Sequence, residues 1–261
     1  MPDLPPRFAR PGPAGFAIAA GALALVVSAI GGAGVSPTAF AEGLPALARF
    51  LAQAFPPDPS RLPNILGALI ETFQMAIAGT AFGVLAAVPF GILAARGLAP
   101  GRLVRGAARA VIALCRTIPD LVWGLIFVVA VGLGPFAGTL ALAVDTIGYC
   151  GRFFAEAMEE AERGPQEALA AVGAGRIGII ACAVLPSALP GMIAAALFAL
   201  EKATRASVVL GLVGAGGIGV ELKVAMDLFN YAEAATILIC VFVLVLAVEQ
   251  ASQALRRRII A

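Results

Sequence analysis

Few residues of this 261-residue sequence could carry out chemistry, and several common kinds of active site are absent. The sequence contains no histidine, which excludes HExxH zinc sites, Ser-His-Asp triads and histidine proton relays. It has neither a GxxxxGK(S/T) phosphate-binding loop nor a GxSxG nucleophile elbow. The chain therefore cannot hydrolyse ATP by the P-loop route, and an enzymatic function has no recognisable site.

Residues 214–219 read Gly-Ala-Gly-Gly-Ile-Gly, which formally matches the GxGxxG dinucleotide-binding fingerprint. That fingerprint needs a preceding strand, a helix that opens at the pyrophosphate and an acidic residue about twenty positions later. This stretch lies instead between two apolar segments, so we interpret it as a glycine-rich turn or a partly buried external loop. The backbones of Gly214, Gly216 and Gly217 could then approach a partner helix or an anion closely.

Three charged residues stand inside or beside long apolar segments, where ionisable groups are costly and are candidates for function. Asp145 lies about nine residues into its segment, and we expect it to pair with a Lys or Arg or with the backbone of a neighbouring helix. Lys202 and Arg205 follow an apolar run and precede the glycines. At the outer end of a span they could attract an anion or simply extend to the membrane interface.

The elements that must position these residues are membrane helices. The chain is 61% hydrophobic and 13% charged, whereas a soluble domain is roughly 25% charged. Charge-free runs of about 20 residues or more carry a helix across the hydrocarbon core, and they occur at 11–41, 72–95, 121–144 and 177–200. The sequence thus predicts an all-α polytopic membrane protein and excludes a soluble globule.

The positions of the 18 basic residues favour six transmembrane helices. A turn at 132–135 gives six spans with 13 basic residues inside and 5 outside, whereas one long helix through this point gives 10 against 8. Cytoplasmic loops carry an excess of Lys and Arg, so we predict six spans and both termini in the cytoplasm. The third span would follow a basic loop at 96–116 and begin near residue 118, and the last three would lie at about 136–156, 177–201 and 231–252.

Residues 1–65 are expected to form a separate N-terminal part, an anchor span followed by an extracytoplasmic segment. Arg7 and Arg10 precede the first apolar run, which favours a cytoplasmic N-terminus. The run from 14 to 35 is longer than the core of a signal peptide, so we favour a retained span over residues 1–41. The alternative is a cleaved signal, because residues 39–41 have the form Ala-Phe-Ala. Residues 43–55 look like a short helix on the membrane surface.

The connection at 152–176 is the most informative segment. It holds five glutamates beside three arginines, and Gly164-Pro165 precedes the alanine-rich stretch 167–175. Such a composition predicts a short amphipathic cytoplasmic helix, which is suited to docking in a groove of a partner protein. The alternative is a solvated linker.

This segment resembles the cytoplasmic signature of the membrane permeases of ABC importers. That signature reads E-A-A, a glycine four residues later, nine intervening residues and I-x-L-P. Here Glu167-Ala168-Leu169, Gly173 and Ala183-Val184-Leu185-Pro186 reproduce the spacing, with Leu169 and Ala183 as apolar departures. Three further stretches, 116–138, 151–160 and 209–222, are similar to the phosphonate-type branch, and the resemblance covers about 70–258.

The resemblance implies a type I ABC importer permease fold over 66–258, with a coupling helix at about 159–176 that docks on an ATPase subunit. The implied contact residues are Glu159, Glu160, Gly164, Glu167, Ala168, Gly173 and Arg176. It implies a second copy of this chain, two cytoplasmic ATPase subunits that bind ATP and Mg, and a periplasmic or extracellular substrate-binding protein. The chain itself would carry no cofactor, catalytic residue or metal, would bind no nucleic acid, and would lie in the lipid bilayer of the bacterial inner membrane.

The implied activity is inward transport of a phosphonate, or of a related oxyanion such as phosphite or a phosphate ester, by alternating access. Pro186 and Pro190 interrupt the fifth span and could mark a moving gate, since proline removes backbone hydrogen bonds. For Asp145 the resemblance adds the alternative of contact with the amino group of an aminoalkylphosphonate. Gly79 and Gly83 form a GxxxG pair, which we expect to pack within one chain rather than across a dimer.

Two functions from other classes compete with this interpretation. A secondary transporter driven by an ion gradient would show internal repeats and coupling-ion carboxylates at the midplane. We find no repeat, and Asp145 is the only carboxylate deep in a predicted span. A membrane-embedded enzyme is disfavoured by the missing histidine and nucleophile motifs.

Overall fold

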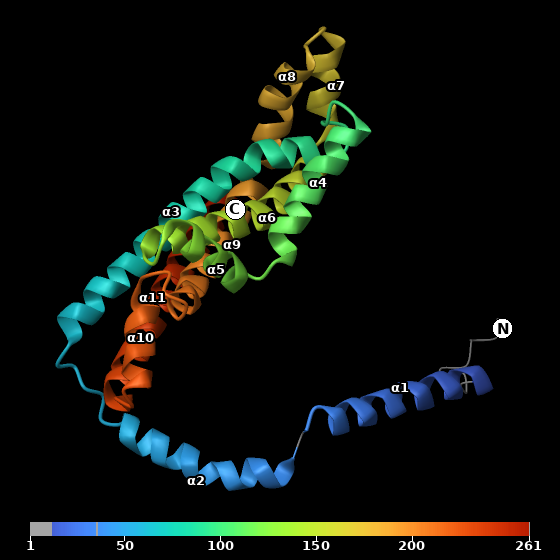
Figure 1. Ribbon diagram of the computed structural model, residues 1–261. Coiled ribbons are helices and arrows are strands. Elements are labelled where there is room, and N and C mark those ends of the chain that lie inside the picture. The colour runs from blue at the N-terminus through green and yellow to red at the C-terminus, as the bar shows by residue number, and fades with distance from the viewer. Residues whose placement is uncertain (1–11, 35, 261) are drawn as a thin grey trace. The chain divides into compact units, whose positions relative to one another are not determined.

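The computed structural model describes residues 12–34 and 36–260, and over this part it consists of helices without strands (Figure 1). Arg7 and Arg10, which support the predicted cytoplasmic N-terminus, lie outside the described residues. The chain divides into two compact units, Met1–Ala52 and Gln53–Ala261.

The N-terminal unit contains α1 (Pro13–Gly32) and most of α2 (Pro37–Ala54). None of the α1 residues is buried in the chain, and α1 is long and apolar enough to cross a membrane. Such a helix is stable with its apolar surface in lipid. The helix predicted at 43–55 is present as α2, which begins earlier, at Pro37. Whether residues 1–41 are retained as a span or cleaved as a signal stays a prediction.

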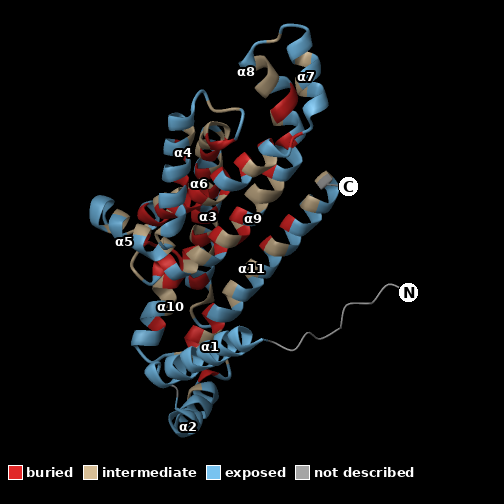
Figure 2. Cartoon of the chain, turned by 90° about the vertical axis from the view of Figure 1, so that its right-hand side faces the viewer, coloured by how far each residue is buried: buried red, intermediate tan, exposed pale blue. Residues whose placement is uncertain are grey.

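The second unit is built on four long helices, α3 (Leu62–Ala94), α6 (Pro135–Glu159), α9 (Leu185–Gly211) and α11 (Tyr231–Ile260). The central helix is α6, which contacts α3, α4, α5 and α9. Buried residues concentrate where these helices meet (Figure 2). The shorter elements are α4 (Arg102–Thr117), α5 (Asp120–Val131), α7 (Arg163–Ala171), α8 (Arg176–Ile179) and α10 (Ile218–Asp227).

Four helical segments have the length and composition of membrane spans, namely α1, α3, the stretch 176–211 and α11. A fifth arises if the bent pair α4 and α5 is one span. The 25-residue helix α6 is long enough to cross, but Asp145 and Arg152 within it lower its hydropathy. The predicted count of six requires α6 to be a span as well, and it stays a prediction.

The basic segment predicted as a loop at 96–116 is instead largely the helix α4, and this part of the prediction is wrong. Its apolar residues Ala108, Ile112 and Cys115 are buried, while its arginines remain exposed or half-buried. This amphipathic pattern forms a helix because the body of the molecule covers one face. The chain then bends by 93° before α5, where Pro119 cannot continue the helix. The 12-residue α5 is too short to span a membrane alone.

The turn predicted at 132–135 is confirmed between α5 and α6. Gly132 and Gly134 adopt φ values of 94° and 133°, a region that side chains other than glycine rarely enter. Pro135 then begins α6 in the first helical turn, where its missing N–H costs nothing. Two glycines and a proline thus specify this reversal.

The predicted break at Pro186 and Pro190 takes the form of a π-helical turn at Ile180–Val184 within a continuous helix. The backbone N–H of Leu185 donates to the carbonyl oxygen of Ile180, five residues back, so the helix widens just before the prolines. α9 then continues to Gly211, ten residues beyond the predicted end of the span. Lys202 and Arg205 therefore lie within α9, which corrects their predicted position at its outer end.

α3 and α6 approach closely through Gly79 and Gly83, so the GxxxG pair packs within the chain as predicted. A Cβ atom at Gly79 would lie 2.7 Å from the Cβ of Leu142 and 3.0 Å from the carbonyl oxygen of Thr139. At Gly83 it would lie 2.7 Å from the carbonyl oxygen of Ala143. These contacts leave no room for a side chain, and they set the spacing of the two helices.

We expect Gly83→Leu to lower the free energy of unfolding by about 1–3 kcal/mol or more, because the added side chain must force α3 and α6 apart. The thermal unfolding midpoint of the purified protein measures this effect. The matched control is Gly67→Ala in the same helix, where a Cβ meets nothing within 4 Å and alanine favours the helix. An unchanged midpoint for Gly83→Leu would contradict the packing described here.

Candidate functional site

The predicted coupling helix is α7, which projects with α8 from the body of long helices (Figures 1 and 2). None of its residues is buried, and Glu167 and Ala168 are exposed. Gly173 ends the helix with φ 81°, and the N–H of Ala174 donates to the carbonyl oxygen of Leu169. Glycine tolerates this conformation and so permits a sharp helix end. Gly164, Glu167, Ala168 and Gly173 therefore share one exposed hairpin.

The other predicted coupling residues lie at the base of this hairpin. Glu160 is the residue after the last turn of α6, and Glu159 ends that helix. Glu159 accepts hydrogen bonds from the backbone N–H of Arg96 at 2.8 Å and from Arg109 at 2.7 Å. Arg176 donates to the carbonyl oxygens of Gly97 and Ala99 at 3.1 and 2.6 Å. Glu159 and Arg176 thus tie both ends of the hairpin to the body of the molecule.

Asp145 pairs with Lys202, as expected for a carboxylate among apolar helices. The Nζ atom of Lys202 lies 2.6 and 2.8 Å from the two carboxylate oxygens of Asp145, and 3.7 Å from Asp120 Oδ1. The three charges join α5, α6 and α9. Asp120 is the first residue of α5, next to the bend, and its sequence position gave no sign of this pairing. Lys202 is neutralised by this pairing, whereas Arg205 is exposed and has no hydrogen-bond or ion-pair partner among the described residues.

The backbone of the glycine loop at 212–217 binds the carboxylate of a residue in the same chain, Glu71. The N–H of Gly217 donates to the carboxylate of Glu71 at 2.8 Å, and the N–H of Ile218 donates to the hydroxyl of Thr72 at 2.7 Å. Gly214, Gly216 and Gly217 adopt φ values of 85°, 86° and 74°, and the last two are buried. Two residues of α3 therefore cap the N-terminus of α10, where N–H groups need acceptors.

The loop is partly buried, as predicted, but the sequence contained no signal for Glu71 and Thr72 as its partners. A single Glu at the edge of an apolar run has no distinguishing spacing. Pro186 lies apart from this loop, in the first turn of α9. The predicted substrate-path residues are therefore divided between the π-turn, the Lys202 pair and the glycine loop.

Two further ion-pair groups connect α11 to the rest of the second unit. Arg61 lies 2.6 Å from Glu233 of α11 and 3.2 Å from Glu221 of α10. Arg256 lies 2.6 Å from the buried Glu201 of α9. These pairs hold α11 against α9 and α10 at points far apart along its length.

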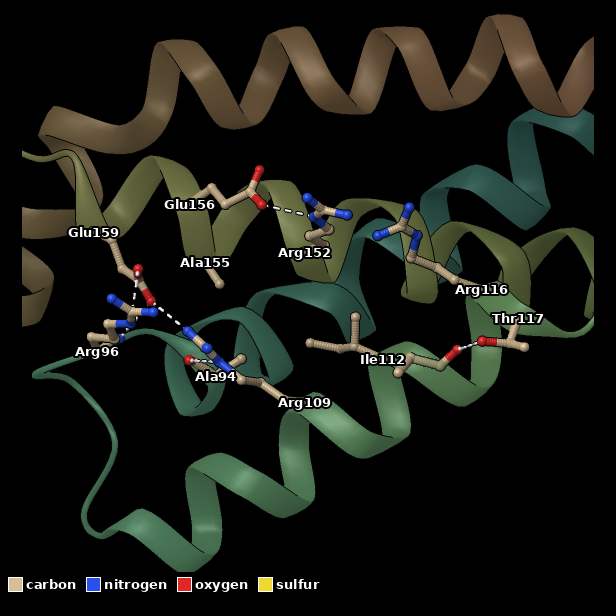
Figure 3. Close-up of a pocket in the computed structure, with 11 residues that line it drawn as sticks. Ala94, Arg96, Arg109, Ile112, Arg116, Thr117, Arg152, Ala155, Glu156 and Glu159 are labelled. Atoms are coloured by element: carbon tan, nitrogen blue, oxygen red, sulfur yellow. Dashed lines mark hydrogen bonds and ion pairs between the residues drawn. The ribbon is translucent and has the colours of Figure 1, made fainter. Parts of the chain in front are cut away.

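A cleft of about 540 Å³ lies between the end of α3, α4 and α6 (Figure 3). Four arginines and two glutamates line it beside smaller residues: Arg96, Arg109, Arg116, Arg152, Glu156 and Glu159. Three of these arginines lie in the segment whose charge predicted a cytoplasmic position. Over the described part of the chain, no group of three or more Cys, Asp or Glu side chains could hold a metal ion.

Comparison with known proteins identifies related sequences over most of the chain. Residues 87–261 match the family model described as the inner membrane component of binding-protein-dependent transport systems. The phosphite transport system permease protein PtxC of Stutzerimonas stutzeri is 41% identical over 220 residues, which cover 84% of this chain and 80% of that protein. The phosphate-import permease protein PhnE of Mycolicibacterium smegmatis is 39% identical over 224 residues, covering 85% of this chain and 42% of that protein.

The fold also matches a solved structure. A chain of the inward-facing MetNI methionine ABC transporter superposes with a TM-score of 0.69 at 24% identity. The superposition covers 77% of this chain and 99% of that chain. The predicted type I ABC importer permease fold is therefore confirmed.

Replacing Lys202 by Met would leave the buried carboxylate of Asp145 without its partner. We expect the free energy of unfolding to fall by about 2 kcal/mol, less than for a fully buried pair, because the Lys202 side chain is 37% exposed. Adding Asp145→Asn to this variant should recover part of the loss. The control is Lys223→Met, which removes an exposed pair with Asp227 and should change the unfolding midpoint little. Equal effects of the two Lys replacements would refute a special role for the Asp145 pair.

Thr72→Val tests the cap that α3 provides for α10. The variant keeps the shape of the side chain but leaves the buried N–H of Ile218 without an acceptor, so we expect a loss of about 1–3 kcal/mol in unfolding free energy. Thr139→Val serves as the control, since the hydroxyl of Thr139 bonds only within its own helix, to Pro135. Thermal unfolding of both variants measures the difference, which should be clearly larger for Thr72→Val.

Proposed function

This chain belongs to the family of inner membrane components of binding-protein-dependent transport systems, and from that membership we propose that it carries a phosphorus oxyanion into the cell. It is the permease subunit of an ABC importer and works with an ATPase and a substrate-binding protein. Its position is the inner membrane, which it crosses several times. The cargo, the stoichiometry and the orientation are parts of the proposal.

The proposed cargo is a phosphonate or a related oxyanion such as phosphite or a phosphate ester. The relatives named for phosphite and phosphate transport support this class, because they are about 40% identical over more than four fifths of the chain. The charge of the chain supports an anionic cargo, since Arg205 is exposed without a partner among the described residues and four arginines line one cleft. Anions are attracted to clefts in which positive charge exceeds negative charge.

We propose that the working assembly contains two copies of this chain, two ATPase subunits on the cytoplasmic side and a periplasmic or extracellular binding protein. Both termini would be cytoplasmic, and so would α7. ATP and Mg would bind to the ATPase subunits, because this chain lacks the P-loop motif. The complete assembly would be an ABC-type phosphonate-transporting ATPase.

The proposed mechanism rests on the exposed hairpin of α7, whose two ends are hydrogen-bonded to the body of the second unit through Glu159 and Arg176. Closure of the ATPases would displace α7, and the bonds of Glu159 and Arg176 would pass the displacement to α4, α6 and the segment after α3. The Lys202 pair would then carry it to α5 and α9. A nucleotide can shift the equilibrium between the outward-open and inward-open states only as far as it binds more tightly to one state than to the other.

Reconstitution into liposomes tests the proposal against an ion-driven secondary transporter. The permease, its ATPase and its binding protein are combined, and uptake of radiolabelled phosphite, phosphate and methylphosphonate is measured. We expect uptake of at least one of them only with ATP and the ATPase. Uptake that persists without the ATPase and follows an ion gradient would favour the secondary transporter.

We expect Ala168→Arg to abolish ATP-driven uptake and co-purification of the ATPase, because a long charged side chain on the exposed face of α7 would block docking. The folded permease itself should be unaffected, because Ala168 is exposed. The control is Ala107→Arg, which changes an exposed alanine on α4 in the same way and should retain uptake. The coupling assignment fails if both variants transport equally well.

A further inference from the structure

The four arginines of the cleft shown in Figure 3 are not matched by the same number of carboxylates. Arg96 and Arg109 share Glu159, with Arg109 at 2.7 Å and Arg96 at 3.9 Å. Arg152 pairs with Glu156 at 2.7 Å. Arg116 has no hydrogen-bond or ion-pair partner within the described chain. The cleft therefore holds an excess of positive charge, and one guanidinium in it is unneutralised.

The position of Arg116 is determined by the crossing of α4 over α6. A Cβ atom at Gly148 would lie 2.8 Å from Arg116 Cγ and 2.9 Å from its backbone nitrogen. The stem of Arg116 thus rests directly on the backbone of α6, one turn from Arg152. Because Gly148 has no side chain, α4 can come close enough to bring an arginine of each helix to the same end of the cleft.

The side chains of Arg116 and Arg152 extend toward one another in this cleft (Figure 3). Both guanidinium groups are always protonated, so their mutual repulsion is unfavourable unless an anion lies between them. Glu156 offsets only one of the two charges and lies beside Arg152 on the same helix. The N–H groups of a guanidinium match the oxygens of phosphate-like anions in pairs.

We propose that the cleft binds a phosphorus oxyanion between Arg116 and Arg152. This inference rests on the proposed function, which it deepens by giving the permease a binding site of its own. The ligand is the transported oxyanion or the phosphate of an anionic lipid headgroup, since both present the same group to the arginines. Arg109 and Arg96 add positive charge at the other end of the cleft.

The site lies next to the coupling hairpin. A second cleft of about 370 Å³ shares Arg96 and Glu159 with the first and is also lined by Arg163, Gln166, Glu167 and Ala170 of α7. An anion that attracts Arg109 or Arg96 competes with Glu159, which ties the base of the hairpin. The two clefts therefore share residues that hold α7 in place.

Equilibrium dialysis of the full-length permease against radiolabelled inorganic phosphate tests the proposal. The protein is kept in dodecyl maltoside, which contains no phosphorus. We expect saturable binding that Arg116→Gln weakens roughly tenfold or more, because a charge-assisted pair of hydrogen bonds is lost. Arg116→Lys should bind more tightly than Arg116→Gln but less tightly than the parent protein, since it keeps the charge without the planar fork.

Arg102→Gln is the matched control, because Arg102 is an exposed arginine of α4 outside the cleft. It should bind phosphate like the parent protein. Equal weakening by Arg102→Gln and Arg116→Gln, or no saturable binding by the parent protein, would overturn the proposal. Unfolding midpoints equal to that of the parent protein show that each variant is folded.

A second arm identifies the source of the oxyanion. If short-chain phosphatidylglycerol displaces phosphate and its own binding depends on Arg116, the site binds lipid headgroups. If phosphate binding persists unchanged in phosphatidylglycerol nanodiscs, the site binds the free oxyanion. Binding is measured without the ATPase, so its absence beside intact ATP-driven uptake would reject the site and leave the proposed function standing. Binding without any uptake of phosphorus oxyanions would support the site and reject the proposed function.

Discussion

A charge among apolar helices is stable only when an opposite charge or a hydrogen-bond donor lies beside it, and this constraint joins the helices of the second unit. Lys202 of α9 binds Asp145 of α6 and lies near Asp120 of α5. Glu201, the next residue of α9, is buried and pairs with Arg256 of α11. Two adjacent residues of one helix thus connect it to three others. Because each pair is lost when its helices separate, the charges specify which faces meet.

Close helix packing brings these charges within reach of one another. Gly79 and Gly83 let α3 approach α6, and Gly148 lets α4 cross α6. The same approach aligns Glu71 and Thr72 of α3 with the backbone N–H groups that open α10. Small residues and paired charges therefore act together: the first bring the helices close, and the second hold them in register. A body joined in this way is suited to transmit a displacement of α7 instead of absorbing it.

The cations of the second unit differ in whether a carboxylate neutralises them. Arg116 and Arg205 have no partner among the described residues, whereas Lys202, Arg61 and Arg256 are neutralised by carboxylates. A path for a doubly charged anion needs enough positive charge to admit it, but a site that binds too tightly would not release it. The pairing of Lys202, Arg61 and Arg256 with carboxylates is consistent with weak and transient binding of the proposed anionic cargo.

The sequence by itself determined the class of the protein and the features encoded in neighbouring residues. Apolar runs required membrane helices, two glycines and a proline specified the turn at 132–135, and the spacing from Glu167 to Pro186 predicted the coupling segment through its resemblance to the permease signature. It also required a partner for Asp145, since a buried carboxylate is unstable alone. These are local properties, because periodicity, turn chemistry and burial cost depend on a few residues.

Only the tertiary structure decided which distant groups meet. Lys202 is 57 residues from Asp145, and Glu71 is 146 residues from Gly217, so no spacing in the sequence could link them. The composition of 96–116 predicts a loop because its basic residues obscure an apolar face, which α3 and α6 cover in the folded chain. The cleft of arginines followed from the same crossing. The composition of a helix determines which of its residues can be buried. Which residues of other helices they then contact depends on how the helices pack in the folded chain.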